Sequence, residues 1–430
     1  MGLIQQQNKM LSNIQPTYTG PRAPASIRLL NTVARRVKPS SDGPNPLMLN
    51  DLFESACRKT GFSDWGDQRF KKAFKVLLES VGREGQLTFF GRFALRQFLT
   101  NNLCNRLRII ETVKRFSEIS QQEILRPIFI TGWYRTGTTY LHNLLATHPH
   151  LRAPLFWELR HPCPAVDPRL ADPQKMIRKV RRTGRIHRYL SPSFSVAHAM
   201  PAEKPEECLH LFENAFCGTT GFFITEAKAY GWWLLQQNVQ HGYEFYKMQL
   251  QLLNWQRPGQ RWVLKWPYHL WHLETLLKTF PDATVIHLHR NPGEAIGSVC
   301  SLAALARSSF CASIDNVALG QFWLDYNETG LQRGFKAREK AGADQILDIR
   351  YPDLMADPLA EISRILKALN LDSDTVWLNA LQANLKTQPK KKQISHQYAP
   401  SQFGLDPGRM RERFTAYMAD YELASKGSGK

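Results

Sequence analysis

The sequence lacks paired cysteines. Its seven cysteines form no C-x-x-C pair, and their number is odd. This spacing argues against a disulfide framework and against a cysteine-based zinc site, and it favours free thiols in a reducing compartment. We therefore expect a cytoplasmic protein.

Long apolar runs are also missing. No hydrophobic stretch reaches the length of a transmembrane helix. The first seven residues are too polar for a signal peptide, and they lack the Ser or Thr of a myristoylation signal. We expect no membrane span.

Acidic residues are scarce relative to basic ones. The chain has 37 Asp and Glu against 56 Lys and Arg, a net charge of +19. Such an excess suits nucleic acid, an anionic membrane surface or a polyanionic small molecule as partner. No zinc-finger or aromatic-studded RNA motif is present, so we expect no nucleic-acid partner. Peripheral contact with an anionic lipid surface stays open.

The most informative stretch is 127–145. A short apolar run at 127–131 precedes a glycine-bounded loop, and residues 140–145 are apolar at helical spacing. Strand, loop and helix in this order form a cradle for a phosphate, because loop amides and the helix N-terminus point at one anion. In a Walker A loop a lysine would stand at Thr138. Here the cation is Arg135, which suits a compact tetrahedral anion on a 5′-phosphate.

Gly-x-x-Arg-Thr-Gly-Thr-Thr after a strand resembles the 5′-phosphosulfate loop of PAPS-dependent sulfotransferases, where PAPS is 3′-phosphoadenosine-5′-phosphosulfate. The arginine-containing version occurs in bacterial and tyrosylprotein enzymes of this family. The resemblance implies that PAPS is the donor. It also implies donor contacts from the loop residues, which are Arg135, Thr136, Gly137, Thr138, Thr139 and Tyr140.

Two later strands support the resemblance. The apolar run 283–289 ends at Arg290, with Ser298 eight residues further on. An arginine fork and a helical hydroxyl resemble the family's 3′-phosphate pair. The short strand 261–265 ends in Lys265, where ligands of α/β sheets bind. This position resembles the catalytic lysine of the tyrosylprotein branch.

A general base is expected shortly after the phosphate loop. Glu158 follows Phe156 and Trp157, which would desolvate its carboxyl group and raise its pKa toward that of a usable base. Related enzymes keep a glutamate at a similar distance, and His161 is the alternative. We expect Glu158, Arg135 and Lys265 to be catalytic. No metal is expected, because Arg and Lys can supply the charge stabilisation.

The chain divides into four regions. Residues 1–46 form an extended arm with a short amphipathic helix at 26–33, and residues 47–125 form a helical lead with helices at 70–81, 87–98 and 103–116. Residues 126–420 form the catalytic domain, with a closing helix at 409–417 and a helix starting at Pro205. Glu206 and Glu207 would lie near the positive end of that helix's dipole, which explains them structurally without a catalytic role. Residues 421–430 form a flexible tail. The resemblance implies an α/β fold with a central parallel sheet and helices on both faces. A late basic loop would close over the nucleotide through Lys391, Lys392 or His396.

The expected reaction moves a sulfuryl group from PAPS to a hydroxyl or amine of a lipophilic, glycolipid or phenolic small molecule. The nucleotide product is 3′,5′-bisphosphoadenosine. The alternatives are a P-loop kinase or NTPase and a basic nucleic-acid-binding protein. A kinase would need a Walker lysine and an Asp-ended strand for magnesium, whereas these strands end in Lys265 and Arg290.

Overall fold

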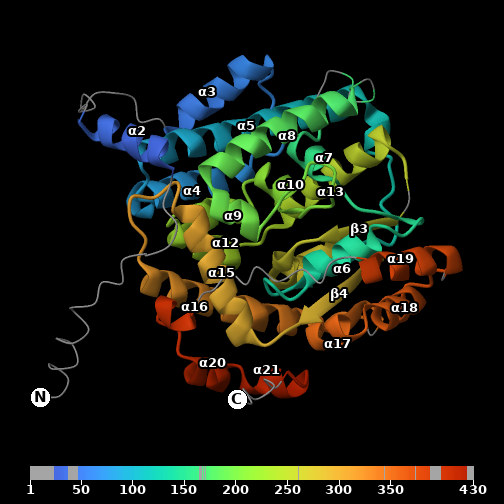
Figure 1. Cartoon of the computed structure of the whole chain (residues 1–430). Coiled ribbons are helices and arrows are strands. Elements are labelled where there is room, and N and C mark those ends of the chain that lie inside the picture. The colour runs from blue at the N-terminus through green and yellow to red at the C-terminus, as the bar shows by residue number, and fades with distance from the viewer. Residues whose placement is uncertain are drawn as a thin grey trace, which may run out of the picture.

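The computed structural model describes residues 24–36, 47–163, 167, 169, 171–259, 261–342, 344–372, 374–387 and 399–423 (Figure 1). Most of the expected arm, the end of the tail and the predicted closing residues Lys391, Lys392 and His396 lie outside these ranges. Within them, no helix combines the length and apolar character that a bilayer crossing requires. All seven cysteines are free.

A five-stranded sheet lies at the centre of the molecule, in the order β2-β3-β1-β4-β5. All of its pairings are parallel. The strands are β1 Ile128–Gly132, β2 Leu151–Arg152, β3 Arg261–Lys265, β4 Thr284–His289 and β5 Ile346–Arg350. β1 is buried along its whole length, as expected for a central strand with helices on both sides.

Alternation along β1 divides the core into two layers. Ile128 and Ile130 join one apolar cluster, whereas Phe129 between them joins another, because successive side chains of a strand point to opposite faces. The first face is covered by α6 Thr138–Leu145, α17 Tyr351–Ala356, α18 Pro358–Ala368 and α19 Thr375–Thr387. The second is covered by α13 Gln240–Gln256, α14 Leu273–Thr279, α15 Pro292–Arg307 and α16 Asn316–Arg338. The predicted fold class is confirmed.

The N-terminal helices pack on the second face. They are α2 Ala25–Arg36, α3 Leu49–Thr60, α4 Phe70–Glu84 and α5 Phe89–Arg115. The buried side chains of α3, α4 and α5 share one cluster with the sheet residues Phe129 and Leu264, and α2 packs on α5. Two separate helices were expected at 87–98 and 103–116, but α5 is continuous. Asn102 is buried, so packing overrides the weak helix propensity of the polar residues at the junction.

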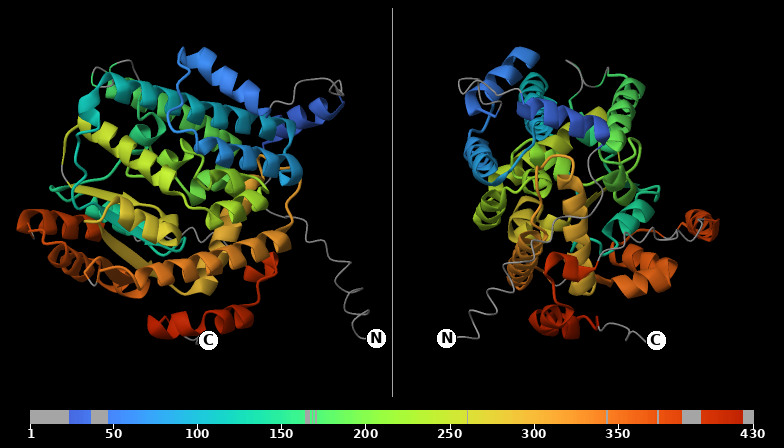
Figure 2. Two further views of the ribbon diagram at one scale, coloured as in Figure 1. Left: turned by 180° about the vertical axis from the view of Figure 1, so that it is seen from behind. Right: turned by 60° about the vertical axis from the view of Figure 1, so that its left-hand side comes forward.

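The segment between β2 and β3 is helical. It contains α7 Phe156–Arg160, α8 Pro173–Leu190, α9 Pro192–Ala197, α10 Leu209–Glu213, α11 Thr220–Ile224 and α12 Lys228–Gln236. A helix start was expected at Pro205, but α10 begins at Leu209. Pro205 instead forms an isolated bridge with Leu155. Both views of Figure 2 show helices stacked above the sheet, with α3 at the top, beyond α5.

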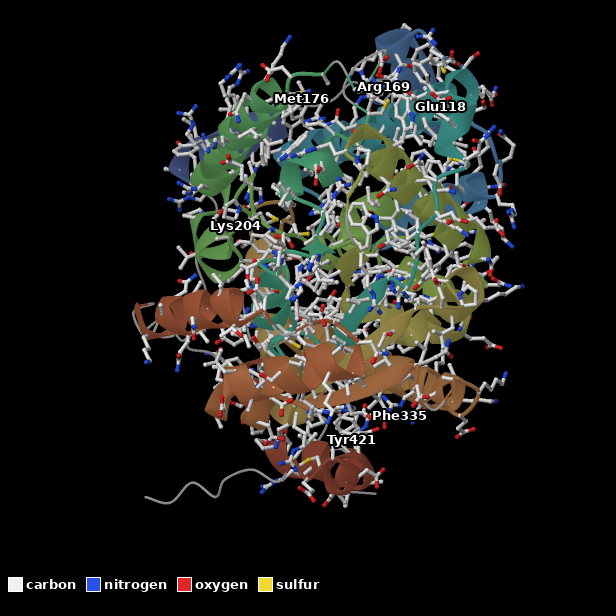
Figure 3. The ribbon with its side chains drawn as sticks, turned by 90° about the vertical axis from the view of Figure 1, so that its right-hand side faces the viewer. Glu118, Arg169, Met176, Lys204, Phe335 and Tyr421 are labelled. Atoms are coloured by element: carbon white, nitrogen blue, oxygen red, sulfur yellow. The ribbon has the colours of Figure 1, made fainter. Side chains whose placement is uncertain are left out.

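The C-terminal region forms two short helices in place of the single one expected at 409–417. α20 Pro407–Arg413 and α21 Thr415–Asp420 are separated at Phe414, which packs into the core. They lie beneath α16, where Phe335 and Tyr421 face each other with ring centroids 5.9 Å apart (Figure 3). The described part of the chain also contains three short 3₁₀ helices, η1 Ser117–Ile119, η3 Pro267–His272 and η4 Pro400–Phe403.

Candidate active site

The loop between β1 and α6 lies at the carboxyl edge of the sheet. The first helical bond of α6 runs from the N–H of Leu141 to the carbonyl of Gly137, at 3.0 Å. The N–H groups of Thr138, Thr139 and Tyr140 precede that bond and therefore point out of the helix end. The structure thus brings the predicted loop residues to one helix N-terminus, where an anion is favoured.

Two glycines shape this loop. Gly137 has a φ of 89°, and a Cβ there would lie 3.0 Å from the ring of Tyr351. Gly132 has a φ of 141°, and a Cβ there would lie 2.5 Å from the carbonyl oxygen of Leu288. A side chain at either position would press against these neighbours, and the positive φ values favour glycine. The geometry requires glycine at both ends of the loop.

Arg135 adopts a left-handed conformation with a φ of 64°. This conformation costs free energy for a residue with a side chain, and it occurs most often at functional loops. The side chain is exposed, and its guanidinium makes no hydrogen bond or ion pair with the described residues. Thr136, in contrast, is buried and donates its hydroxyl hydrogen to the Trp133 carbonyl at 2.7 Å. The Thr136 hydroxyl therefore stabilises the loop, and only the backbone of Thr136 is left to contact a ligand.

Lys265 reaches this loop from the end of β3. Its side chain is buried, and its Nζ donates to the hydroxyl of Thr139 at 3.2 Å. The same Nζ lies 2.6 Å from Oε1 of Glu207. A buried ammonium group needs such a partner, because desolvating it alone is costly. The structure therefore places a cation and a carboxylate beside the helix end that was expected to hold phosphate.

Glu207 was assigned only a helix-dipole role from the sequence. That interpretation is wrong in detail, because the Glu207 carboxylate bonds to Lys265 and lies outside α10. Tyr134 lies close by, and burial together with the negative charge of Glu207 raises the pKa of its hydroxyl. The hydroxyl therefore stays protonated at neutral pH. No local sequence signal could have paired Glu207 with a lysine 58 residues away.

Arg290 extends the site from the end of β4. Its Nη1 donates to the carbonyl oxygen of Arg135 at 2.5 Å, and its guanidinium stacks over Tyr351 at 4.3 Å. Its Nε and Nη2 donate to Glu294, at 2.9 and 2.6 Å. Ser298 lies on α15, which starts two residues after Arg290, and is half-buried. The two predicted phosphate-binding segments are thus joined by a direct hydrogen bond.

Glu158 is held firmly by its surroundings. The residue is buried, and its Oε1 lies 3.2 Å from both Arg152 and Arg257. Its Oε2 accepts a hydrogen bond of 2.8 Å from the N–H of Leu155, which satisfies the N-terminus of α7. These contacts explain Glu158 as a structural residue. Its predicted role as base stays a prediction.

The alternative base, His161, directly follows the last residue of α7. Burial lowers the pKa of its imidazole to about 3, with neighbouring Lys179, Arg160 and Arg108 adding to the effect. An imidazole with so low a pKa is a weak proton acceptor at neutral pH. This environment does not favour His161 as the base.

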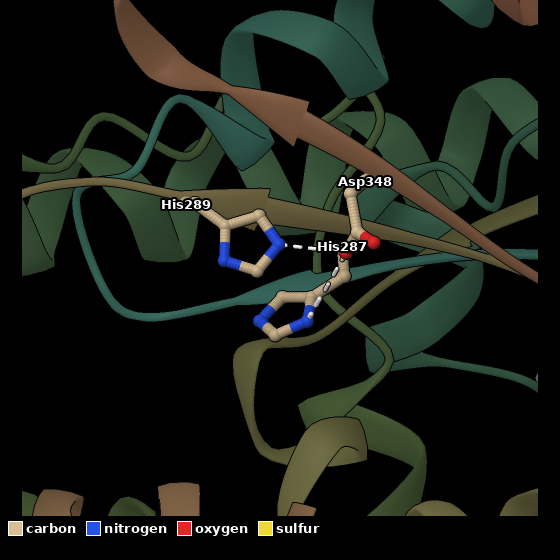
Figure 4. A group of neighbouring side chains, drawn as sticks. All are labelled: His287, His289 and Asp348. Carbon is tan, nitrogen blue, oxygen red and sulfur yellow. Dashed lines mark hydrogen bonds and ion pairs between the residues drawn. The ribbon is translucent and has the colours of Figure 1, made fainter. Parts of the chain in front are cut away.

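One group of side chains in the described residues could hold a metal ion, namely His287, His289 and Asp348 (Figure 4). The Arg338 guanidinium already donates to both Asp348 oxygens and to Nδ1 of His287, each at 2.7 Å. His289 bonds to Asp348 at 2.7 Å and to the Tyr417 hydroxyl at 3.1 Å. Arg338 therefore occupies the place of a cation. The expected independence of metal stays a prediction.

Comparisons with known proteins agree with this geometry. A family model described as "Sulfotransferase family" matches residues 127–375. A curated relative, omega-hydroxy-beta-dihydromenaquinone-9 sulfotransferase Stf3 of Mycobacterium bovis, is 26% identical over 64% of this chain and 71% of its own.

Two solved structures share the fold and more than a quarter of the aligned residues. Sulfotransferase STF1 of Mycobacterium tuberculosis is 29% identical, with a TM-score of 0.76, over 86% of this chain and 99% of its own. Sulfotransferase STF9 of Mycobacterium avium is 26% identical, with a TM-score of 0.81, over 90% of this chain and all of its own. The family match spans the loop, Lys265, Arg290 and the whole sheet. The chain therefore belongs to the sulfotransferase family.

Proposed function

We propose that this sulfotransferase uses PAPS as donor and transfers its sulfuryl group to a hydroxyl group of a lipophilic acceptor. The observation that carries the donor assignment is the bond from Arg290 to the carbonyl of Arg135. It brings an arginine suited to a 3′-phosphate next to a loop suited to a 5′-phosphosulfate. The family match gives no support to the alternative function as a P-loop kinase or NTPase.

The chain's charges fit the reaction. The acceptor oxygen attacks sulfur, and the bond from sulfur to the 5′-phosphate oxygen breaks, releasing 3′,5′-bisphosphoadenosine. Negative charge grows on that phosphate as the bond breaks. Arg135 and Lys265 would stabilise it, while the amides at Thr138 and Thr139 hold the phosphate itself. The Lys265–Thr139 contact of 3.2 Å supports this arrangement.

The proton of the acceptor hydroxyl needs a base. We assign this role to Glu207, because its carboxylate contacts Lys265 and its side chain is only partly buried. Glu158 is the second candidate, as expected from the sequence. Arg152, Arg257 and the N–H of Leu155 already occupy lone pairs of the Glu158 carboxylate. Fewer lone pairs are therefore free to accept a substrate proton.

The acceptor class rests on the curated relative, whose name describes an omega-hydroxylated dihydromenaquinone. Such a molecule presents a hydroxyl group on a long apolar chain. The aromatic residues that suggested a lipophilic site are largely core, since Phe212, Phe216 and Phe222 are buried. Phe223 is half-buried and lies 6.3 Å from Tyr134, between ring centroids. Phe223 is therefore the aromatic residue that supports a lipophilic acceptor site beside the phosphate loop.

Two experiments test this function. Thermal shifts with 3′,5′-bisphosphoadenosine, ATP–magnesium and an oligonucleotide should show stabilisation by the first alone, because a ligand of the folded state raises its stability with concentration. Incubation with sulfur-labelled PAPS and a lipid extract should label a hydroxyl-bearing lipid. Labelling that appears only in the water-soluble fraction would contradict the lipophilic acceptor, and stabilisation by ATP–magnesium alone would contradict the donor.

A further inference from the structure

One region of the surface combines exposed apolar side chains with an excess of basic ones. On α2, Leu29, Leu30 and Val33 are 65%, 42% and 50% exposed. At the start of α5, Phe89 and Phe93 are 50% and 54% exposed. Exposed apolar clusters of this kind mark interaction sites more often than scattered single residues do.

The end of α8 and the following α9 continue this region. Ile186 and Tyr189 on α8 and Val196 on α9 are each more than half exposed. The Tyr189 hydroxyl lies 2.9 Å from the Ser26 hydroxyl of α2. We call the exposed residues of α2, α8, α9 and the first turns of α5 the apolar–basic face.

Specific bonds hold the four elements of this face together. The Asn31 side chain of α2 accepts a hydrogen bond of 3.0 Å from the N–H of Phe90 in α5. Ser191, between α8 and α9, bonds to Ser309 at 2.7 Å. The next residue, Phe310, stacks on Phe90 with ring centroids 6.2 Å apart. Figure 2 (right) shows α2 lying across the front of the molecule, with α8 beside it.

The charge on this face is of one sign. α8 contains seven Lys or Arg and no Asp or Glu in its sequence, and α2 and α9 also contain no acidic residue. Arg178 and Arg181 pair with Asp172 and Glu203 of neighbouring segments. Arg182, Arg185 and Arg188 are exposed and make no ion pair with the described residues. In Figure 3, α8, which carries the labelled Met176, lies at the edge of the molecule with nitrogen-tipped side chains around it.

We propose that the apolar–basic face docks on an anionic lipid bilayer surface. Basic side chains beside exposed apolar ones are typical of helices that lie in the membrane interface, where cations contact lipid phosphates and apolar groups enter the acyl boundary. The charge argues against a second copy of this chain, because two such faces would repel each other. Most of the exposed apolar side chains of this face are aliphatic, which argues against nucleic acid, because nucleic-acid bases stack on aromatic side chains.

The face also adjoins the site. α9 ends at Ala197, and the next residue, His198, lies 3.9 Å from Glu206, measured from Nε2 to Oε1. Glu207, the proposed base, follows directly. Docking would therefore bring the site to the layer in which a lipid acceptor lies. This last step rests on the proposed function, whereas the docking itself does not.

Flotation of the full chain with vesicles tests the docking. Vesicles of phosphatidylcholine mixed with phosphatidylglycerol should bind the protein, and vesicles of phosphatidylcholine alone should bind it much less. The triple variant Arg182→Gln, Arg185→Gln, Arg188→Gln should lose about two orders of magnitude in affinity, at about fivefold for each basic residue. The variant Phe89→Ser, Phe93→Ser should lose about tenfold, because apolar burial contributes to interfacial binding.

Matched controls lie on another side of the molecule. Lys386→Gln, Arg409→Gln, Arg411→Gln removes three exposed charges from α19 and α20, and Val376→Ser removes an apolar residue that is 77% exposed. Both should leave vesicle binding unchanged. Loss of binding in these controls equal to that in the face variants, or no binding by the parent chain, would overturn the proposal. Oligonucleotide binding that the arginine variant loses and the Phe89 and Phe93 variant keeps would point to nucleic acid.

The affinity for 3′,5′-bisphosphoadenosine, measured on the same preparations, separates this proposal from the proposed function. It should be equal in all variants, because none of these residues lies in the nucleotide site. Vesicle binding without nucleotide binding would overturn the donor assignment alone.

Discussion

Glu207 Oε1 lies 2.6 Å from Nζ of Lys265, and that Nζ also contacts the hydroxyl of Thr139 in the phosphate loop. A carboxylate, a buried cation and a helix N-terminus therefore meet at one place. This arrangement is the basis for our proposal that Glu207 accepts the proton next to the groups that would stabilise the leaving phosphate.

The first prediction separates the two candidate bases. Glu207→Gln should lower kcat by ~10²–10⁴-fold, the range for a positioned general base, while nucleotide affinity stays near that of the parent. Glu158→Gln should leave kcat within a few-fold and lower the free energy of unfolding by about 3 kcal/mol, because Arg152 and Arg257 lose a charged partner.

Steady-state kinetics and urea unfolding on both variants check this prediction. The pH dependence of kcat is the more specific readout, since loss of a base removes the acidic limb of the profile. A Glu207→Gln enzyme with the parent's profile, together with an inactive but stable Glu158→Gln enzyme, would reverse the assignment.

A second prediction concerns the partner of Arg290. The guanidinium donates to Glu294 at 2.6 Å and 2.9 Å, and a bound 3′-phosphate would have to compete with that carboxylate. Glu294→Gln should therefore bind 3′,5′-bisphosphoadenosine several-fold more tightly, with little change for 5′-AMP. Calorimetry with the two nucleotides checks this. Weaker binding of the bisphosphate would mean that Glu294 orients Arg290 and does not compete with the ligand.

Metal dependence gives a third prediction. If Arg135 and Lys265 supply the charge stabilisation, sulfate transfer should continue nearly unchanged in EDTA. Transfer assays with and without the chelator measure this directly. Activity that disappears in EDTA and returns with magnesium would contradict the assigned roles of the two cations.

The fourth prediction concerns stability in acid. His142 and His272 are buried, and burial lowers the pKa of each to about 3, with the charge of Lys265 and Arg333, respectively, adding to the effect. Between pH 6.5 and 3 the unfolded chain binds protons that the folded chain does not, so stability falls as pH falls. Each histidine should contribute a loss of about 1.4 kcal/mol by pH 5.5, one unit below its unfolded pKa.

Urea unfolding at pH 7.5 and 5.5 measures this loss. Buried Glu213, whose pKa burial raises to about 7, acts in the opposite direction, so the comparison needs His142→Gln and His272→Gln variants. These should flatten the pH dependence. A free energy of unfolding that rises on acidification by the same amount in parent and variants would contradict the histidine account.

The sequence predicts the elements of this site that depend on local signals. Gly132 and Gly137 at the loop, and Lys265 and Arg290 at strand ends, all lie at the carboxyl edge of the sheet as expected. The pairing of Glu207 with Lys265 depends on a tertiary contact between a loop and a distant strand. From the sequence, the helix-start pattern at Pro205 already explained Glu207, so nothing indicated this pairing. The buried Asn102 within α5 and the two-residue strand β2 were missed for the same reason, since packing and not propensity determines them.

We propose that the phosphate loop and Arg290 bind the two phosphorylated ends of one nucleotide. Calorimetry of 3′,5′-bisphosphoadenosine and 5′-AMP with the parent, Arg290→Ala and Arg350→Ala tests it most directly. Arg350 is a matched control, because it ends the neighbouring strand β5 and pairs with Asp353. We predict that Arg290→Ala loses about 2–3 kcal/mol for the bisphosphate and little for 5′-AMP, as expected for one charge-assisted contact, while Arg350→Ala binds both as the parent does. Equal weakening of both nucleotides by Arg290→Ala, or a parent enzyme that does not distinguish them, would contradict the account.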